Sequence, residues 1–520
     1  MTARFDEATL AQITAARPDA STWLAANAGS GKTRVLTDRV ARLLLEGVLP
    51  EHILCLTYTK AAATEMQNRL FKRLGGWAMK DDDALRGELG NLGVEADFSA
   101  DYLRQARTLF ARAIEAPGGL RIQTIHAFCA ALLRRFPLEA GVSPQFTEME
   151  DRAADLLREE ILEQMAEGED APLIAAIAPH LSDDGAQLLR AITGGRDGFL
   201  PARDEAALAA AYDLPPDAGP EVVLQHVFLG DEVALAGQLA AHLDDGTSTD
   251  KTLAKGLRAV TAPDHAGLAE LEGVLLTKTG SLRKTLGTQK IRKAAPDLFE
   301  RLDQLAARVE EARGLRAALE ALARDRALHA FARAFLHRYD GEKARRGWLD
   351  FDDLITRTRD LLETPAVAEW VLYRLDGGID HILVDEAQDT SPVQWQVIER
   401  LAQEFTAGQG ARPDVTRTIF VVGDKKQSIY SFQGADPSGF DRMRDSFAEG
   451  LAATGAPLNA MMLEYSFRSA APILDLVDHV FDGAAESGFT PDQRHRAFNR
   501  DLPGRVELWP VVEKVSDDED

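Results

Sequence analysis

Three short, mainly apolar runs lie far apart along this chain, and each of them ends in polar residues. They are residues 21–26, 379–384 and 419–422. Runs of this length are typical of strands buried in a parallel sheet. After the first run, apolar residues recur at helical spacing from Val35 to Leu44. Alternating strand and helix signals over residues 1 to about 145 therefore predict an α/β fold.

The hydrophobic pattern changes in the middle of the chain. From about Glu148 to Arg346 the sequence is rich in Ala, Leu and Arg with helical periodicity, most clearly over residues 151–165 and 298–337. Residues 348–354 return to the mixed pattern, and we interpret their acidic residues as a box at a helix N-terminus. Residues 463–481 open another mixed segment. The boundaries that we expect divide the chain into residues 1–147, 148–346, 347–445 and 446–520.

The first strand leads into a loop of small residues that is suited to phosphate. Lys32 supplies a charge for the β- and γ-phosphates of a nucleotide, and Thr33 supplies a hydroxyl for Mg²⁺. The loop faces the N-terminus of the expected helix, whose partial positive charge favours anions. Ala26 stands where the general pattern has Gly, and a chance Gly/Ser loop is the alternative. The residues expected to hold the nucleotide here are Ala28, Gly29, Ser30, Gly31, Lys32, Thr33 and Arg34.

The other two strands end in residues with complementary chemistry. Asp385 is suited to hold Mg²⁺, and Glu386 to take a proton from the attacking water, although a solvated acidic turn is the alternative. Gln427, after the third strand, offers an amide that can bond a γ-phosphate or position water. Arg468 would complete the charge neutralisation, and Phe467 would stack on a base. The catalytic candidates are therefore Lys32, Asp385, Glu386, Gln427 and Arg468.

In this order, the motifs resemble those of UvrD/Rep-like superfamily 1 DNA helicases, and most closely the AddA branch of bacterial AddAB helicase–nucleases. Residues 57–66 and 124–129 are similar to the family's DNA-contacting motifs, and residues 385–391 and 423–432 match the next two. Gln12 stands where the family reads adenine. Lys426, where many relatives carry an acid, favours the AddA/RecB branch, as does the long segment between His126 and Asp385.

The resemblance implies a P-loop NTPase (RecA-like) motor lobe with a parallel sheet, interrupted by a large, mainly helical insertion at 148–346. Residues 446–520 would begin an incomplete second motor lobe. The implied cofactors are ATP and Mg²⁺, and the implied activity is 3′→5′ DNA unwinding in double-strand-break repair by recombination. Implied partners are single-stranded DNA, duplex ends and an AddB-type subunit. The insertion would flank DNA, and a partner-docking role for it remains open.

Aromatic and hydroxyl residues just past strand ends are the candidates for DNA contact. Aromatic faces there can stack on successive bases without reading sequence, at about 1–3 kcal/mol per base, and ordinary core packing is the alternative. Gln433 stands where relatives usually have Arg, which leaves its role open. The DNA-binding candidates are Tyr58, Thr59, Thr124, His126, Tyr430 and Phe432.

Composition limits the remaining possibilities. The chain has 520 residues, of which 45% are hydrophobic and 27% charged, as in ordinary globular proteins. Its net charge of −24 confines any DNA contact to a local electropositive track. Cys55 and Cys129 sit in apolar segments and are expected to be buried, reduced thiols. Because no apolar stretch would cross a bilayer, we expect no membrane partner and a cytoplasmic, nucleoid-associated protein.

Two hypotheses remain at this stage. The late helicase motifs and the nuclease of the AddA branch have no counterpart before Asp520, and residues 506–510 are expected to form a strand. We therefore expect an N-terminal portion of a longer protein, with weak ATP turnover of its own. The first hypothesis is an ATP-driven helicase subunit. The alternative is a non-catalytic ATP- and DNA-binding scaffold.

Overall fold

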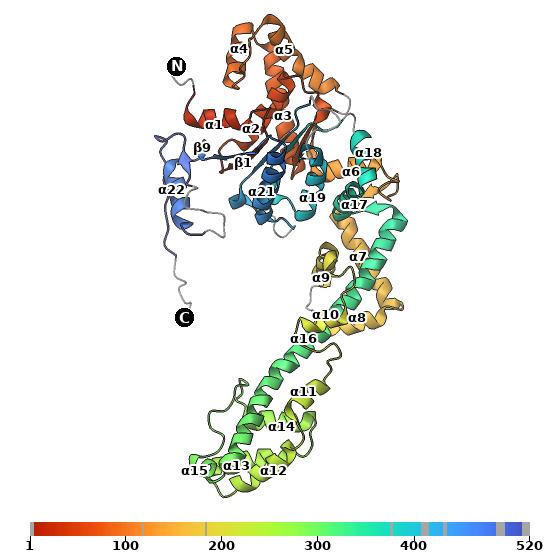
Figure 1. The fold of residues 1–520 in the computed structure, drawn as a ribbon, viewed down its shortest axis with the longest axis vertical. Helices are drawn as coiled ribbons and strands as arrows, with labels where there is room; N and C mark the ends of the chain where they lie inside the picture. Colours follow the sequence, from red (N-terminus) through yellow and green to blue (C-terminus); the bar gives the residue numbers. More distant parts are fainter. Residues whose placement is uncertain are drawn as a thin grey trace, which may run out of the picture. The chain divides into compact units, whose positions relative to one another are not determined.

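A computed structural model describes residues 5–116, 119–181, 185–374, 378–406, 415–429, 434–484 and 494–511. Contacts between residues divide the chain into two compact units, and Figure 1 shows both. The first unit combines residues 1–148 with residues 347–520, and the second contains residues 149–346. We call them the sheet unit and the helical unit.

The sheet unit is built on six parallel strands, which confirms the expected α/β class. The three expected strands are β1, β6 and β7, and they are neighbours or next neighbours in the sheet. The strand order is β3-β2-β6-β7-β1-β8, and all five pairings are parallel. The strands are β1 (Thr22–Ala26), β2 (Ile53–Thr57), β3 (Arg121–Thr124), β6 (His381–Val384), β7 (Thr418–Gly423) and β8 (Asn459–Leu463).

Helices cover both faces of this sheet, and successive strand residues point alternately into two cores. In β1, for example, Trp23 belongs to one core and Leu24 to the other. Parallel sheets are typically covered in this way, so their strands are apolar on both faces. The core on the Leu24 face includes α2 (Lys32–Leu45), α3 (Lys60–Met79) and α5 (Ala100–Glu115). The core on the Trp23 face includes α6 (Ile125–Arg135), α17 (Phe351–Glu363), α19 (Pro392–Leu401) and α21 (Pro437–Ala453).

The acidic residues near position 350 form a helix cap, as the sequence indicated. The Asp350 side chain accepts the backbone N–H of Asp353 at 2.8 Å, and the Asp353 side chain accepts the backbone N–H of Asp350 at 3.0 Å. This reciprocal capping box fixes the start of α17. Just before it, β5 (Trp348–Leu349) pairs in parallel with β4 (Thr147–Glu148), so the two halves of the sheet unit meet where the chain leaves and returns.

Two expectations about the C-terminal part were wrong. The boundary expected after Asp445 falls inside α21, and β8 pairs with β1 in the same six-stranded sheet, so this sheet extends to Leu463. Residues 506–510 form no strand, and Leu508 and Trp509 are 98% and 80% exposed. Without a neighbouring strand, an apolar run has no backbone partner with which to form a ladder. The remaining elements of the unit are α1 (Glu7–Ala15), α4 (Asp82–Asn91), α18 (Pro365–Arg374), α20 (Gln403–Thr406), β9 (Tyr465–Ser466), α22 (Ala471–Val480) and β10 (Arg496–Ala497).

The helical unit is organised around one long helix, α16 (Pro296–Arg346), which spans 51 residues. Phe331, Phe335 and Tyr339 lie on one of its faces at four-residue spacing, with successive ring centroids 5.9 and 6.0 Å apart. The helical stretches expected at 151–165 and 298–337 lie within α7 (Asp151–Glu167) and α16. The other helices are α8 (Ala171–Ile177), α9 (Gly185–Gly194), α10 (Glu205–Ala210), α11 (Glu221–Val227), α12 (Glu232–Leu243), α13 (Ser248–Ala259), α14 (His265–Leu275) and α15 (Gln289–Ala294).

Trp23 anchors the core on its face of the sheet and offers a test of the packing. Its ring lies 5.8 Å from that of Trp395 and 5.0 Å from that of Phe440, and Trp23 is 2% exposed. Trp23→Ala should lower the free energy of unfolding by about 3–5 kcal/mol, because it leaves a large cavity. Chemical denaturation measures this change. The control Trp509→Ala removes an exposed ring, and an equal loss in both variants would contradict the packing.

Candidate active site

Four of the candidate motifs come together because their strands are neighbours. The order β6-β7-β1-β8 places the ends of these strands side by side, and in a parallel sheet all carboxyl ends lie at one edge. Asp385 follows β6, Gln427 lies in a short 3₁₀ turn after β7, the phosphate loop follows β1, and Arg468 follows β8 and β9. Segments from opposite ends of the chain thus meet in one crevice.

Two glycines give the loop after β1 its shape. Gly29 and Gly31 have φ angles of 76° and 89°, in the left-handed region that favours glycine. A Cβ at Gly29 would lie 2.7 Å from Cβ of Arg468, and the Gly29 carbonyl accepts the backbone N–H of Phe467 at 2.9 Å. The loop therefore packs closely against the segment that carries Arg468. Gly31 caps α2, so Lys32 and Thr33 lie in the first helical turn.

Lys32 connects the phosphate loop to the other two motifs. Its Nζ lies 3.0 Å from Glu386 Oε2 and donates a hydrogen bond of 3.4 Å to Gln427 Oε1. The Lys32 side chain is 10% exposed, so this charge is largely shielded from water. In the sequence, Glu386 and Gln427 lie 354 and 395 residues after Lys32. Their convergence places a cation, a carboxylate and an amide within reach of one point.

The two acids after β6 lie in different environments. The backbone N–H of Asp385 donates to the Leu56 carbonyl at 2.9 Å, and its carboxylate is buried. Burial, and then the nearby charge of Glu386, raises the pKa of Asp385 to about 7. Glu386 has φ 50°, a left-handed backbone that costs a non-glycine residue free energy and often marks a functional position.

The oxygen donors near the loop suit a magnesium ion. Mg²⁺ prefers hard oxygen ligands and is commonly held by one or two protein groups together with substrate phosphates. The Thr33 hydroxyl and the Asp385 carboxylate are donors of this kind. Within the described ranges no cluster of three or more His, Cys, Asp or Glu side chains is arranged to hold a metal. The donor set therefore fits an ion held mainly by phosphates, rather than a closed protein cage.

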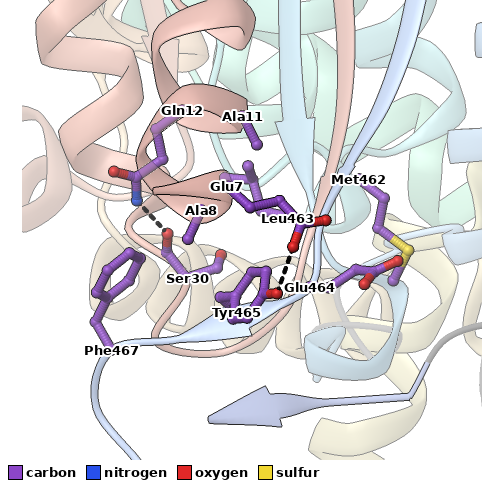
Figure 2. Close-up of a pocket in the computed structure, with 10 residues that line it drawn as sticks. All are labelled: Glu7, Ala8, Ala11, Gln12, Ser30, Met462, Leu463, Glu464, Tyr465 and Phe467. Carbon is purple, nitrogen blue, oxygen red and sulfur yellow. Dashed lines mark hydrogen bonds between the residues drawn. The ribbon is translucent and has the colours of Figure 1, made fainter. Parts of the chain in front are cut away.

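A pocket beside the loop contains Gln12 and Phe467, and Figure 2 shows its lining. Gln12 is 4% exposed and donates from Nε2 to the Ser30 carbonyl at 2.8 Å. Among the described residues, Gln12 Oε1 has no hydrogen-bond partner. On the other side, the Tyr465 hydroxyl donates to Glu7 Oε2 at 2.8 Å, which ties α1 to β9. The pocket therefore offers a buried amide acceptor near an aromatic ring.

Two arginines of the predicted site lie in different surroundings. The Arg34 Nε lies 3.7 Å from Asp38 Oδ2 on the same helix, and the Arg34 side chain is 52% exposed. A helix turns by about 100° per residue, so Arg34 lies on another side of α2 than Lys32. Arg468 is exposed, and its Cβ lies close to Gly29. The nucleotide role of Arg34 and the charge-neutralising role of Arg468 stay predictions.

The DNA-contact candidates on β2 and β3 lie at the same sheet edge, on the other side of β6. Thr59 and Thr124 are the N-caps of α3 and α6, where their hydroxyl oxygens accept backbone N–H groups at 3.1 and 3.2 Å. Capping uses an acceptor lone pair, so each hydroxyl proton stays available to a phosphate. Tyr58 is half-buried at the end of β2. Tyr430, Phe432 and Gln433 lie outside the described residues.

His126 is half-buried and packs against an aromatic residue that the sequence did not single out. Its ring lies 5.3 Å from the ring of Phe351 in an edge-to-face arrangement, and Phe351 is 42% exposed. Burial lowers the pKa of His126, which favours the neutral imidazole. A neutral imidazole can bond a phosphate or sugar through its N–H, as the prediction for His126 requires.

Several polar residues of the crevice were not predicted to be part of it. Gln388 bonds both to Glu386 in its own motif and to the backbone of Asp424. It therefore links the motif at residues 385–391 to the motif at residues 423–432. Lys426 Nζ donates to Asn27 Oδ1 in the phosphate loop and lies 3.3 Å from His495 Nε2. Burial lowers the pKa of Lys426. The only signal in the sequence was their position inside the motifs, and His495 lacked even that.

Residues 7–448 match the UvrD/REP helicase N-terminal domain, and the chain belongs to this family. Curated relatives give the more particular likeness. The chain is 29% identical over 512 residues to an ATP-dependent helicase/nuclease subunit of Geobacillus thermodenitrificans, covering 88% of this chain and 38% of the relative. A protein of the same name from Ligilactobacillus salivarius is 28% identical, with 82% and 35% covered. The chain thus spans a little more than a third of the length of these relatives.

Two further expectations from composition can be compared with the structure. Cys55 and Cys129 are both buried free thiols, as expected, and burial raises the pKa of each, that of Cys129 to about 12. In the part of the chain that the structure describes, no helix has the length and hydrophobicity needed to cross a membrane.

The close packing of Gly29 on Arg468 can be tested with a matched pair of glycines. Gly47, with φ 89°, also has a left-handed backbone, but a Cβ there would meet no atom within 4 Å. Gly47→Ala should therefore lose only the cost of a left-handed alanine, about 1–2 kcal/mol. Gly29→Ala should lose clearly more, because Arg468 or the loop has to move. Thermal unfolding measures both variants, and equal losses would argue against the contact.

Proposed function

We propose that this chain is the ATP-hydrolysing motor portion of a DNA helicase subunit. The observation that carries the proposal is the convergence of Lys32, Glu386 and Gln427, from three separate motifs, at the carboxyl edge of a parallel sheet. Membership of the UvrD/REP helicase N-terminal domain family supports ATP as the fuel and DNA as the track. The 3′→5′ polarity and the role in double-strand-break repair rest on the resemblance to the AddA branch.

We assign nucleotide binding to the loop and the neighbouring pocket. Gln12 Oε1, a buried acceptor, suits the amino group of adenine, and the ring of Phe467 suits its face. Residues 28–31 would cradle the phosphates with backbone N–H groups at the N-terminus of α2. A bound triphosphate competes with Glu386 for the ammonium of Lys32. Once Lys32 has turned to the phosphates, the carboxylate of Glu386 is released for water.

The hydrolytic roles follow from the chemistry of each group. Glu386 takes a proton from the attacking water, while Gln427 orients that water or the γ-phosphate through its amide. Arg468 balances negative charge that develops on the phosphate oxygens. Thr33 and Asp385 would hold Mg²⁺, which neutralises the β- and γ-phosphates when bound.

We place single-stranded DNA at the ends of β2 and β3. Tyr58 offers a stacking face, and Thr59 and Thr124 offer hydroxyls at the starts of α3 and α6, where helix dipoles favour phosphate. Tyr430 and Phe432 are proposed as further stacking residues from sequence alone. Because β6 lies between β2 and β7, the two proposed sites share one sheet edge.

The remaining assignments concern the organisation of the whole protein. We propose that the helical unit flanks duplex DNA or docks a partner, and that a second motor lobe begins beyond the six-stranded sheet. A partner protein of the AddB type and a cytoplasmic site of action on chromosomal DNA are proposed on the same resemblance. The names of the relatives from Geobacillus thermodenitrificans and Ligilactobacillus salivarius join helicase and nuclease activities.

Two variants separate binding from hydrolysis. Lys32→Ala should abolish tight ATP binding, because the phosphates lose their closest cation. Glu386→Gln should retain ATP binding and lower turnover by about 10²–10⁴-fold, because an amide cannot accept the proton. Equilibrium binding of a fluorescent ATP analogue and steady-state phosphate release, with and without single-stranded DNA, measure the two effects.

The same measurements decide between the two hypotheses. DNA-stimulated turnover that is lost in both variants supports the motor. ATP and DNA binding without turnover in the unaltered chain supports the scaffold instead. Turnover that persists in Glu386→Gln would remove Glu386 from the role of base.

The DNA site is tested by Tyr58→Ala. Loss of one stacking face should weaken single-strand binding by about 1–3 kcal/mol and leave ATP affinity unchanged in the absence of DNA. Fluorescence anisotropy with a labelled oligonucleotide measures the DNA affinity. The control is Tyr102→Ala, which removes a second half-buried tyrosine of the sheet unit that lies on α5 instead of at a strand end. Equal DNA affinity in both variants would contradict the stacking role.

A further inference from the structure

Gln388 belongs to the motif at residues 385–391 and contacts the motif at residues 423–432, and it has no role in the proposed function. It is 1% exposed and sits in the 3₁₀ turn Ala387–Asp389, directly after Glu386. Its Nε2 donates to Glu386 Oε2 at 2.8 Å and to Asp389 Oδ2 at 3.2 Å. Its Oε1 accepts the backbone N–H of Asp424 at 2.8 Å. Both ends of this buried amide are therefore bonded.

The neighbours of Gln388 leave its amide only one orientation. One end faces two carboxylates, which only accept hydrogen bonds, and the other faces a backbone N–H, which only donates. Reversing the amide would place an oxygen against both carboxylates and a donor against a donor. Gly423 leaves the space for this arrangement, since a Cβ there would lie 2.8 Å from Gln388 Oε1.

These bonds complete a closed circuit through three motifs. Lys32 bonds to Glu386, and Gln388 joins Glu386 to the backbone of Asp424. The Asp424 carboxylate accepts a hydrogen bond from Gln427 Nε2 at 2.5 Å. Gln427 Oε1 in turn accepts a hydrogen bond from Lys32, which closes the circuit. Each residue in the circuit restricts the next. The circuit is partly buried, and polar networks of this kind restrict their members to a single arrangement when every bond is satisfied.

We propose that Gln388 is a positioning residue for Glu386. Through Gln388, the motif at residues 423–432 controls the orientation of the Glu386 carboxylate. This inference rests on the proposed role of Glu386 as the base. With Oε2 held by Gln388, the other carboxylate oxygen of Glu386 is turned toward the water that it deprotonates. The Oε1 end of the Gln388 amide bonds to Asp424, and Asp424 begins the loop that continues to Ser428. The Ser428 hydroxyl donates to the backbone carbonyl of Gln388 at 3.4 Å. Movement of that loop therefore reorients Glu386.

Two substitutions of Gln388 test the proposal in the 520-residue chain. Gln388→Met keeps the approximate shape of the side chain and removes all three of its side-chain hydrogen bonds. It should leave the affinity for a fluorescent ATP analogue unchanged and lower kcat about 10- to 100-fold, the range expected for a misplaced catalytic group. The matched control is Gln394→Met, because Gln394 is also a buried glutamine, and its Oε1 caps α19 through the backbone N–H of Ser391. That control should keep the unaltered kcat.

Gln388→Glu gives a readout that a purely structural role would not move. When protonated, the introduced carboxyl can donate to Glu386 and accept from Asp424, as the amide does. When ionised, it faces the carboxylates of Glu386 and Asp389, and repulsion displaces Glu386. The ratio of its kcat to that of the unaltered chain should therefore rise as the pH falls from about 8 to about 6. A ratio independent of pH would overturn the proposal.

Amide exchange tests the link without requiring turnover. Gln388→Met removes the acceptor for the Asp424 backbone N–H, so hydrogen exchange at this amide should become faster, while Gln394→Met should leave it unchanged. If the unaltered chain binds ATP without turnover, the proposed hydrolysis is wrong. Hydrogen exchange at the Asp424 amide then tests the connection between Gln388 and Asp424 by itself. Equal exchange at Asp424 in the unaltered chain and in Gln388→Met, or an unchanged kcat in Gln388→Met, would overturn it.

Discussion

The parallel arrangement of the six strands is the constraint on which the rest of this protein depends. Because every strand runs in the same direction, every carboxyl end lies at one edge, and the polar residues after β1, β6, β7 and β8 are brought into one crevice. The helices that link the strands bury both faces of the sheet, so its residues are apolar and its edge is the natural place for chemistry. The chain leaves the sheet unit after Glu148 and re-enters it at Gly347, and the helical unit lies between these two points of the sequence.

At that edge, charges are kept close together and away from water. Lys32 is largely buried against Glu386, and burial raises the pKa of Asp385. Low exposure strengthens each electrostatic contact and makes an unpaired charge costly, so such a group responds strongly to a bound phosphate or cation. The circuit of hydrogen bonds through Gln388 also connects these groups to one another. It orients the carboxylate of Glu386 and links it to the loop that leads toward the proposed DNA site.

Sequence reasoning performed best where a residue acts through local backbone geometry. The strands β1, β6 and β7, the helix after the phosphate loop and the capping box at Asp350 were all expected from short patterns. It failed where long-range pairing decides the structure. The boundary near Asp445 was wrong because β8 pairs with β1, far earlier in the chain, and residues 506–510 form no strand because an apolar run needs a neighbour to pair with.

The chemical groups of the site and their order along the chain can be recognised without a structure. Small residues, a lysine, two carboxylates and an amide each occupy motifs whose meaning depends on only a few neighbouring residues. Which of these groups touch depends on the folded chain. The order of strands in a sheet is set by packing and backbone pairing between distant segments, and no local pattern encodes it. Lys32, Glu386 and Gln427 were predicted from their motifs to act together, whereas the bonds that Gln388 makes between motifs, and the contact of Lys426 with His495, became visible only in the folded chain.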